Sequence, residues 1–176
     1  MALPDLVLIH GGGHAADCWD LTIAELRSTA AELRVHAVDL PGRRGKPGDL
    51  RSVTIRDWAD SVVSDIDQAG LDRVVIAGHS MAGLVMPGVM TKLGAARVAE
   101  AIFVVDRSDM PLGVPRTWVM TLDDRTLSEA QQRASIGALG GVDALYPIDT
   151  CHDVMISEPG RLAEILVERC ESEASD

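Results

Sequence analysis

Four short segments of this chain are apolar almost throughout, with none of the polar alternation of a half-exposed strand. Runs of this length are typical of parallel strands that are buried on both faces of a sheet. Two weaker runs follow nearer the C-terminus. The strong runs are residues 6–9, 35–38, 74–77 and 101–105, and the weak ones are residues 117–121 and 145–148.

A helix is predicted between the second and third runs. Apolar residues recur there at positions i, i+3, i+4 and i+7 over residues 55–66. Thr54 precedes this stretch, Asp57 follows Thr54 by three positions, and Gly70 comes after its end. This is the pattern of a capping box and a glycine stop.

Prolines and caps mark two further helices. Ser157 and Pro159 precede the apolar positions of residues 162–166, so we expect a cap and a first-turn proline there. Pro87 lies inside the predicted helix after residue 80 and predicts a kink.

The alternation of strands and helices predicts an α/β fold with an open, doubly wound and mainly parallel sheet of about six strands. At 176 residues the chain is long enough for one proper core. No stretch has the length or composition of a linker. We therefore expect a single domain over residues 1–176.

Charge and cysteine content exclude several classes of protein. The formal net charge of −11 argues against binding to nucleic acid or to an anionic membrane surface. Three unpaired cysteines argue against a disulfide framework or a zinc site. The N-terminus has no basic segment followed by a long apolar run, so the cytoplasm is the expected compartment.

Residues 74–83, Val-Val-Ile-Ala-Gly-His-Ser-Met-Ala-Gly, place a serine on a sharp turn between a buried strand and a helix. This is the pattern of a nucleophile elbow, in which small residues flank a strained serine. Gly78 and Ala82 leave room around Ser80, and Gly83 adds to it. A serine hydroxyl needs a base, an acid and oxyanion donors to act as a nucleophile.

Reactive side chains follow four of the predicted strands. Chemistry in an open parallel sheet collects on the loops that leave the carboxyl ends of its strands. The first such loop is His-Gly-Gly-Gly-His, residues 10–14, and its glycines suit an oxyanion hole. Ser80 follows the third strand, Asp123 and Asp124 the fifth, and His152 the sixth. The order Ser, Asp, His is that of α/β-hydrolases.

The chain resembles the α/β-hydrolases, and within them the small-esterase branch that includes plant methyl-ester hydrolases and hydroxynitrile lyases. Four stretches in the family's order carry the resemblance: Leu-Val-Leu-Ile-His-Gly-Gly-Gly-His with Trp19 downstream, Ala-Val-Asp-Leu-Pro-Gly, Ala-Gly-His-Ser-Met-Ala-Gly, and Cys-His-Asp-Val-Met-Ile-Ser-Glu-Pro. They spread over nearly the whole chain.

The resemblance implies a role for each matching residue. Ser80 corresponds to the nucleophile and His152 to the general base, and the backbone N–H groups of Gly12 and Met81 correspond to the oxyanion donors. Asp124 stands in the family's register for the acid. Its neighbour Asp123 remains the alternative.

The implied activity is hydrolysis of small carboxylic esters through an acyl-enzyme, with a small neutral ester as substrate and no metal or cofactor. A thioesterase or lactonase would use the same residues. A lyase is disfavoured, because the threonine and lysine of hydroxynitrile lyases are replaced by Gly11 and Asp153.

The family's helical cap is missing from this sequence. Only a short segment with two prolines separates residue 105 from residue 117, too short for a cap and short for a parallel crossover. Three explanations are open: a minimal esterase, a homodimer whose partner subunit covers the site, or a non-hydrolytic protein such as a cyclase, a lyase-like enzyme or a ligand-binding protein.

Several residues near the motifs complete the expectations. Gly11, His14 and Met110 are expected to contact substrate. His10 and His14 lack a third metal ligand, so we expect them to anchor the oxyanion loop by hydrogen bonds. His79 is expected to be a packing neighbour of the serine.

Overall fold

The computed structural model describes residues 3–104 and 113–174. Six parallel strands form one open sheet in the order β2-β1-β3-β4-β5-β6, which confirms the predicted fold class. The strands are β1 (Asp5–Ile9), β2 (Val35–Val38), β3 (Val74–His79), β4 (Val98–Val104), β5 (Arg116–Thr121) and β6 (Ala144–Ile148).

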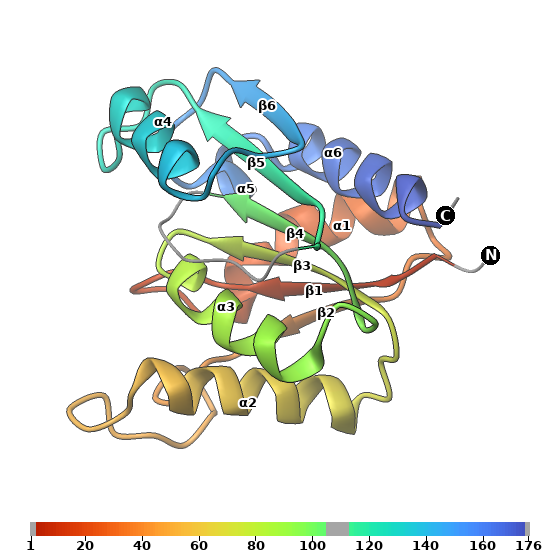
Figure 1. Ribbon diagram of the computed structural model, residues 1–176, viewed down its shortest axis with the longest axis vertical. Coiled ribbons are helices and arrows are strands. Elements are labelled where there is room, and N and C mark those ends of the chain that lie inside the picture. The colour runs from red at the N-terminus through yellow and green to blue at the C-terminus, as the bar shows by residue number, and fades with distance from the viewer. Residues whose placement is uncertain (1–2, 105–112, 175–176) are drawn as a thin grey trace.

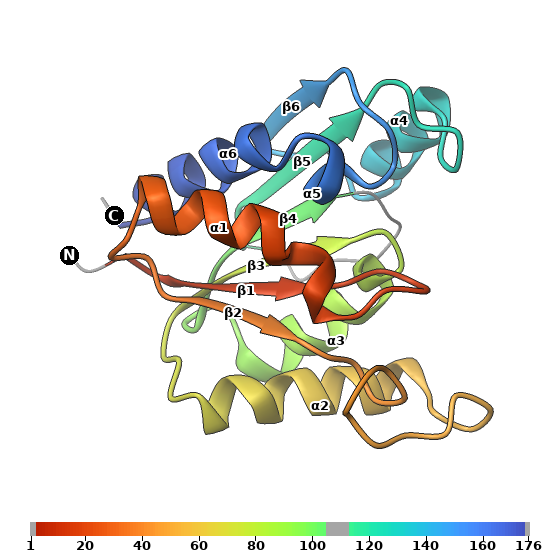
Figure 2. The same cartoon turned by 180° about the vertical axis from the view of Figure 1, so that it is seen from behind.

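Helices cover both faces of the sheet (Figure 1 and, from behind, Figure 2). α2 and α3 pack together on one face, and α1 and α6 pack together on the other. The helices are η1 (Ala16–Trp19), α1 (Asp20–Thr29), α2 (Ile55–Gln68), α3 (Ala82–Leu93), α4 (Glu129–Ala138), α5 (Val154–Ser157) and α6 (Pro159–Ser172). Among the described residues, no helix is both long and apolar enough to cross a membrane.

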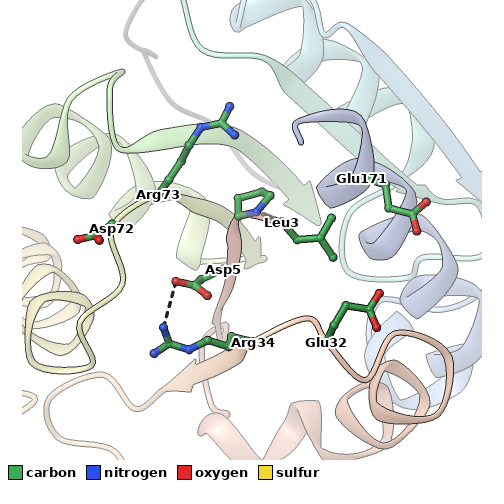
Figure 3. A pocket seen from close by; sticks show the side chains of 8 residues that line it. Leu3, Asp5, Glu32, Arg34, Asp72, Arg73 and Glu171 are labelled. Carbon is green, nitrogen blue, oxygen red and sulfur yellow. Dashed lines mark ion pairs between the residues drawn. The ribbon is translucent and has the colours of Figure 1, made fainter. Parts of the chain in front are cut away.

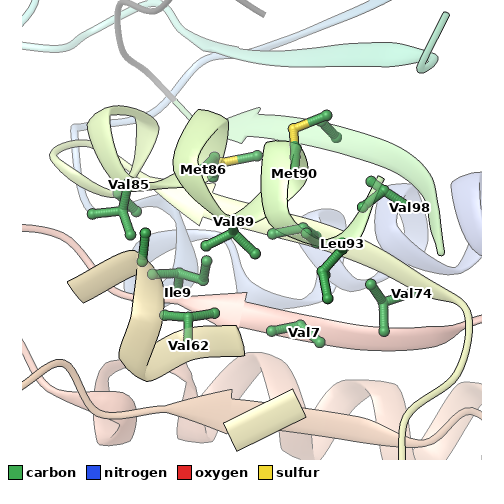
Figure 4. Packing of buried hydrophobic residues seen from close by; sticks show 14 of the residues in the cluster. Val7, Ile9, Val62, Val74, Val85, Met86, Val89, Met90, Leu93 and Val98 are labelled. Atoms are coloured by element: carbon green, nitrogen blue, oxygen red, sulfur yellow. The ribbon is translucent and has the colours of Figure 1, made fainter. Parts of the chain in front are cut away.

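The sheet separates two apolar cores. On the face of α2 and α3, strand residues such as Ile9 and Val74 pack against Val62, Met86 and Val89 (Figure 4). The opposite core joins strand residues to Trp19 and to apolar side chains of α1 and α6. β3 and β4 are buried along their whole length, as continuous apolar runs require.

The predicted ends of two helices can be compared with the structure. At α2 the capping box is confirmed, since Thr54 Oγ1 accepts from Asp57 N and Asp57 Oδ2 accepts from Thr54 N. The cap predicted for the last helix is wrong: Glu158 is the N-cap residue, while Ser157 ends α5. Pro159 does occupy the first turn of α6.

β4 and β5 pair in parallel although only residues 105–115 connect them. The structure describes residues 113–115 of this connection, and they form no helix. Parallel neighbours usually need a crossover of a dozen or more residues. The connection is therefore shorter than those that carry a helix over the sheet.

Candidate active site

Ser80 lies on a strained turn between β3 and α3. Its backbone φ is +49°, in the left-handed region that non-glycine residues rarely adopt. Its N–H donates to Val104 O at 2.8 Å, which fixes the turn to the end of β4. A Cβ on Gly78 would overlap the Met86 sulfur and lie 3.1 Å from the Ala82 Cβ. The small residues are thus required by close packing, as the elbow pattern predicts.

Asp124 and His152 meet at the carboxyl edge of the sheet, on the loops after β5 and β6. His152 Nδ1 lies 2.7 Å from Asp124 Oδ2. The Asp124 side chain is buried, whereas Asp123 is exposed and its carboxylate has no hydrogen bond to His152. The geometry thus selects Asp124 rather than Asp123 as the partner of the histidine.

Hydrogen bonds hold Asp124 in its ionised form. Burial by itself would raise the pKa of this carboxyl group. The N–H groups of Leu127 and Thr126 donate to Oδ1, and His152 and the Thr121 hydroxyl donate to Oδ2. Together they lower the pKa of Asp124 below its usual value. A charged acid at this position orients the imidazole and stabilises an imidazolium.

The elbow and the histidine loop are joined through His79. Its ring centroid lies 4.8 Å from that of His152, and its Nε2 lies 3.0 Å from the His152 carbonyl oxygen. The described residues show no hydrogen bond between Ser80 and His152. Catalytic hydrogen bonds are often loose before substrate binds. Because Ser80 directly follows His79, the loop that carries His152 is nevertheless held against the elbow.

Gly12 and Met81, the predicted oxyanion donors, are neighbours across this edge. A Cβ on Gly12 would lie 3.5 Å from the Met81 sulfur. Neither backbone N–H donates to an acceptor within the described parts of the chain. Backbone N–H groups without an acceptor are what a developing oxyanion needs.

His10 anchors the glycine-rich loop as expected. Its Nδ1–H donates to Gly11 O at 2.9 Å, and its Nε2 accepts from Leu40 N–H at 3.1 Å. Both ring nitrogens are therefore used in one tautomer. Burial lowers the pKa of His10, which keeps the ring neutral.

The three predicted substrate contacts have different surroundings. A Cβ on Gly11 would lie 2.7 Å from His79 Nδ1, so this glycine allows the loop to approach the elbow. The His14 Nε2 atom lies 3.3 Å from Asp153 Oδ1, at the start of α5. Met110 lies outside the described residues.

Sequence reasoning missed the residues that support Asp124 and His152. Thr121 and the turn at residues 126–127 donate to Asp124, and His79 contacts the His152 backbone. The predicted elbow placed His79 beside the serine, but its contact with the His152 backbone depends on tertiary structure. No motif in the sequence marks Thr121 or the turn at residues 126–127.

A cavity of about 360 Å³ opens beside His152. It is lined by Asp123, Arg125, Thr126, Cys151, His152 and Asp153. A larger cavity of about 720 Å³ lies at the opposite, amino end of the strands, among side chains such as the ion pair Asp5–Arg34 (Figure 3). The smaller cavity is the one that adjoins the Asp124–His152 pair.

Several curated relatives of this chain are esterases by name. A pimeloyl-[acyl-carrier protein] methyl ester esterase from Aromatoleum aromaticum is 36% identical over 85 residues, which are 48% of this chain and 30% of that protein. "Probable esterase PIR7A" from Oryza sativa subsp. indica is 35% identical over 104 residues, 56% of this chain and 37% of the relative. The matched segments thus span about a third of the relatives' length.

Solved structures show the same fold at lower identity. The pyrethroid hydrolase PytH superposes with a TM-score of 0.80 at 20% identity, covering 98% of this chain and 99% of that one. The Arabidopsis methylesterase MES16 superposes with a TM-score of 0.82 at 17% identity, covering 94% and 98%. The family model "Alpha/beta hydrolase family" matches residues 6–164. The chain therefore belongs to the alpha/beta hydrolase family.

Proposed function

We propose that this protein is a serine hydrolase that cleaves small carboxylic esters. The observation that carries the proposal is the strained elbow at Ser80 beside the hydrogen-bonded pair Asp124–His152. A serine held at φ +49° costs stability, and such strain persists where the surrounding structure enforces it, commonly at active sites. Esterase relatives support the same reaction class.

The proposed reaction begins with attack of Ser80 Oγ on the ester carbonyl carbon. His152 Nδ1 is bonded to Asp124, so Nε2 is the atom that takes the serine proton. The N–H groups of Gly12 and Met81 stabilise the oxyanion, where one donor is worth about 3 kcal/mol of barrier. His152 then protonates the leaving alcohol, and water hydrolyses the acyl-enzyme.

A small, neutral ester is the proposed substrate because the connection between β4 and β5 is too short to hold a helical cap. We propose that the short connection of residues 105–115 replaces the family's cap. A cavity of about 360 Å³ lies beside His152 and has the volume of a small-ligand site, although Ser80 does not line it. Without a cap the pocket offers few apolar contacts for a long chain. We therefore expect short-chain esters to be turned over faster than long-chain ones.

A fluorophosphonate probe tests the nucleophile directly. We expect stoichiometric labelling, with the adduct on the peptide that contains Ser80. Ser80→Ala should abolish labelling, whereas Ser157→Ala, which removes an exposed serine, should leave it unchanged. The proposal fails if the folded wild-type protein is not labelled or if the Ser80→Ala variant is labelled equally.

A further inference from the structure

Three side chains of types that can bind a metal ion converge from separate segments next to the candidate active site. They are His14 on the loop after β1, His79 at the end of β3, and Asp153 at the start of α5. One ligand atom from each lies within 4.8 Å of the other two. We propose that His14, His79 and Asp153 bind a divalent transition-metal ion such as Zn²⁺, an inference that does not depend on the proposed ester hydrolysis.

The spacing of the ligand atoms supports a shared ion. Asp153 Oδ1 lies 3.3 Å from His14 Nε2 and 3.9 Å from His79 Nε2. Charge-assisted hydrogen bonds would be shorter, about 2.7–2.9 Å. Ligands bound tetrahedrally at about 2.0–2.1 Å from Zn²⁺ are about 3.3–3.4 Å apart. The three atoms lie within 4.8 Å of one another, so side-chain rotations that shorten the longer separations would bring all three to bonding distance of one ion.

Among the described residues, the Asp153 carboxylate has no hydrogen bond that would explain its position. Its Oδ1 atom is buried and has no hydrogen-bond partner there, although His14 Nε2 lies 3.3 Å away. Asp153 is the N-cap residue of α5, where an aspartate side chain usually accepts from the helix N–H groups, yet it makes no such bond. The carboxylate points toward the two imidazoles instead. A buried acceptor without a partner is costly, and a cation between these groups would satisfy it.

His79 would have to exchange a hydrogen bond for the metal. Metal binding requires an imidazole nitrogen that carries no proton. Within the part of the chain that the structure describes, His79 Nδ1 has no hydrogen-bond partner, while Nε2 is 3.0 Å from the His152 carbonyl oxygen. Ligation through Nε2 moves the proton to Nδ1 and gives up that hydrogen bond, which lowers the affinity for the metal.

His10 and Cys151 lie near the cluster and are alternative metal ligands, but within the described parts of the chain only the Cys151 side chain is free of hydrogen bonds that metal binding would have to break. His10 already uses both ring nitrogens in hydrogen bonds to the backbone. Cys151 is exposed and lies two positions before Asp153, so its thiol is the group that a test must exclude. Direct ion pairing of His14 with Asp153, without any metal, is the other explanation that the test must separate.

Isothermal titration of the tag-free protein with Zn²⁺ alone tests the site. We expect one ion per chain. Asp153→Asn and His14→Gln should each weaken binding by at least the ~10–100-fold that is typical of losing a supporting residue. Cys151→Ser and His36→Gln, which alter a thiol and a histidine outside the cluster, should bind as the wild type does.

Thermal unfolding provides a second readout that needs no activity. A ligand that binds only the folded state raises the melting temperature with its concentration. Zn²⁺ should therefore raise the melting temperature of the wild type and of Cys151→Ser but not that of Asp153→Asn. A cooperative melting transition of Asp153→Asn without metal serves as the control that this variant is folded. The proposal is wrong if the wild type binds no Zn²⁺, or if Asp153→Asn and His14→Gln keep wild-type affinity. Loss of binding in Cys151→Ser would also overturn the proposal, because the ion would then be bound adventitiously through the exposed thiol.

Discussion

Asp124 and His152 are joined by a 2.7 Å hydrogen bond between loops that leave neighbouring strands of the sheet. The backbone continues the pairing of β5 and β6 past the end of β5, since Asp123 N–H donates to Thr150 O at 3.0 Å. This contact ties the two loops together one residue before Asp124 and two residues before His152. The register of the sheet thus sets the geometry of the pair.

Replacing Asp124 should remove most of the hydrolytic activity. Asp124→Asn cannot hold the imidazole in the tautomer that leaves Nε2 free, and such a change typically costs on the order of 10⁴-fold in kcat. Asp123→Asn, at the exposed neighbouring position, should change kcat less than about threefold. Steady-state kinetics with p-nitrophenyl acetate compares the two variants. Equal losses in both would show that the assignment of the acid is wrong.

The two glycines of the loop after β1 should respond differently to alanine. A Cβ on Gly11 would lie 3.0 Å from the His79 carbonyl oxygen and 3.1 Å from the Ser80 Cβ, so Gly11→Ala should displace the elbow and lower kcat/KM at least about tenfold. A Cβ on Gly12 would meet only the Met81 side chain. Gly12→Ala should keep the wild-type melting temperature. A fully active Gly11→Ala variant would contradict the requirement for close packing of the loop after β1 against His79 and Ser80.

A buried ion pair between β4 and α6 should contribute to stability. Arg169 Nε lies 3.0 Å from both carboxylate oxygens of the fully buried Glu100. Arg169→Met leaves this carboxylate without its charge partner, which should cost about 3 kcal/mol of unfolding free energy in urea. Arg161→Met removes an exposed pair with Glu164 and should cost less than about 0.5 kcal/mol. Similar losses of unfolding free energy in both variants would show that the burial of the Glu100–Arg169 pair does not increase its contribution to stability.

The folded protein should lose stability as the pH falls below neutrality. Burial lowers the pKa of both His10 and His79, to about 4 for His79. Below about pH 6.5 the unfolded chain takes up protons that the folded state excludes, so the folded state becomes less stable. His79 alone would account for about 3 kcal/mol between pH 7 and pH 4.

Unfolding in urea at several pH values measures this effect. Above about pH 7 both histidines are neutral in both states, and their contribution to the pH dependence should vanish. His10→Gln should flatten the decline between pH 7 and pH 5. A variant with the wild-type slope would show that His10 does not contribute.

Much of the fold could be predicted because local patterns and tertiary structure agree. Apolar runs placed all six strands, and the capping box at Thr54 and Asp57 placed the start of α2. Strand ends were less accurate: β4 begins at Val98 rather than residue 101. The missed residues include Glu100, a charged residue that becomes compatible with a buried strand only through Arg169, 69 positions away.

The candidate site could be predicted as far as its motifs reach. Ser80 and His152 follow from the elbow and from the order of the loops. The choice between Asp123 and Asp124 depended on family register until the structure showed which carboxylate faces the histidine. The cluster of His14, His79 and Asp153 could not be predicted, because two loops and the end of β3 supply its members and only the folded sheet brings them together.

The most direct test of the proposed function compares the wild type with Ser80→Ala in hydrolysis of p-nitrophenyl acetate at pH 8. The structure predicts measurable turnover by the wild type and a loss of kcat on the order of 10⁴-fold or more in the variant, with its fold intact by circular dichroism. Turnover that survives the loss of Ser80, or a folded wild-type protein with none, would contradict the assignment of a serine ester hydrolase.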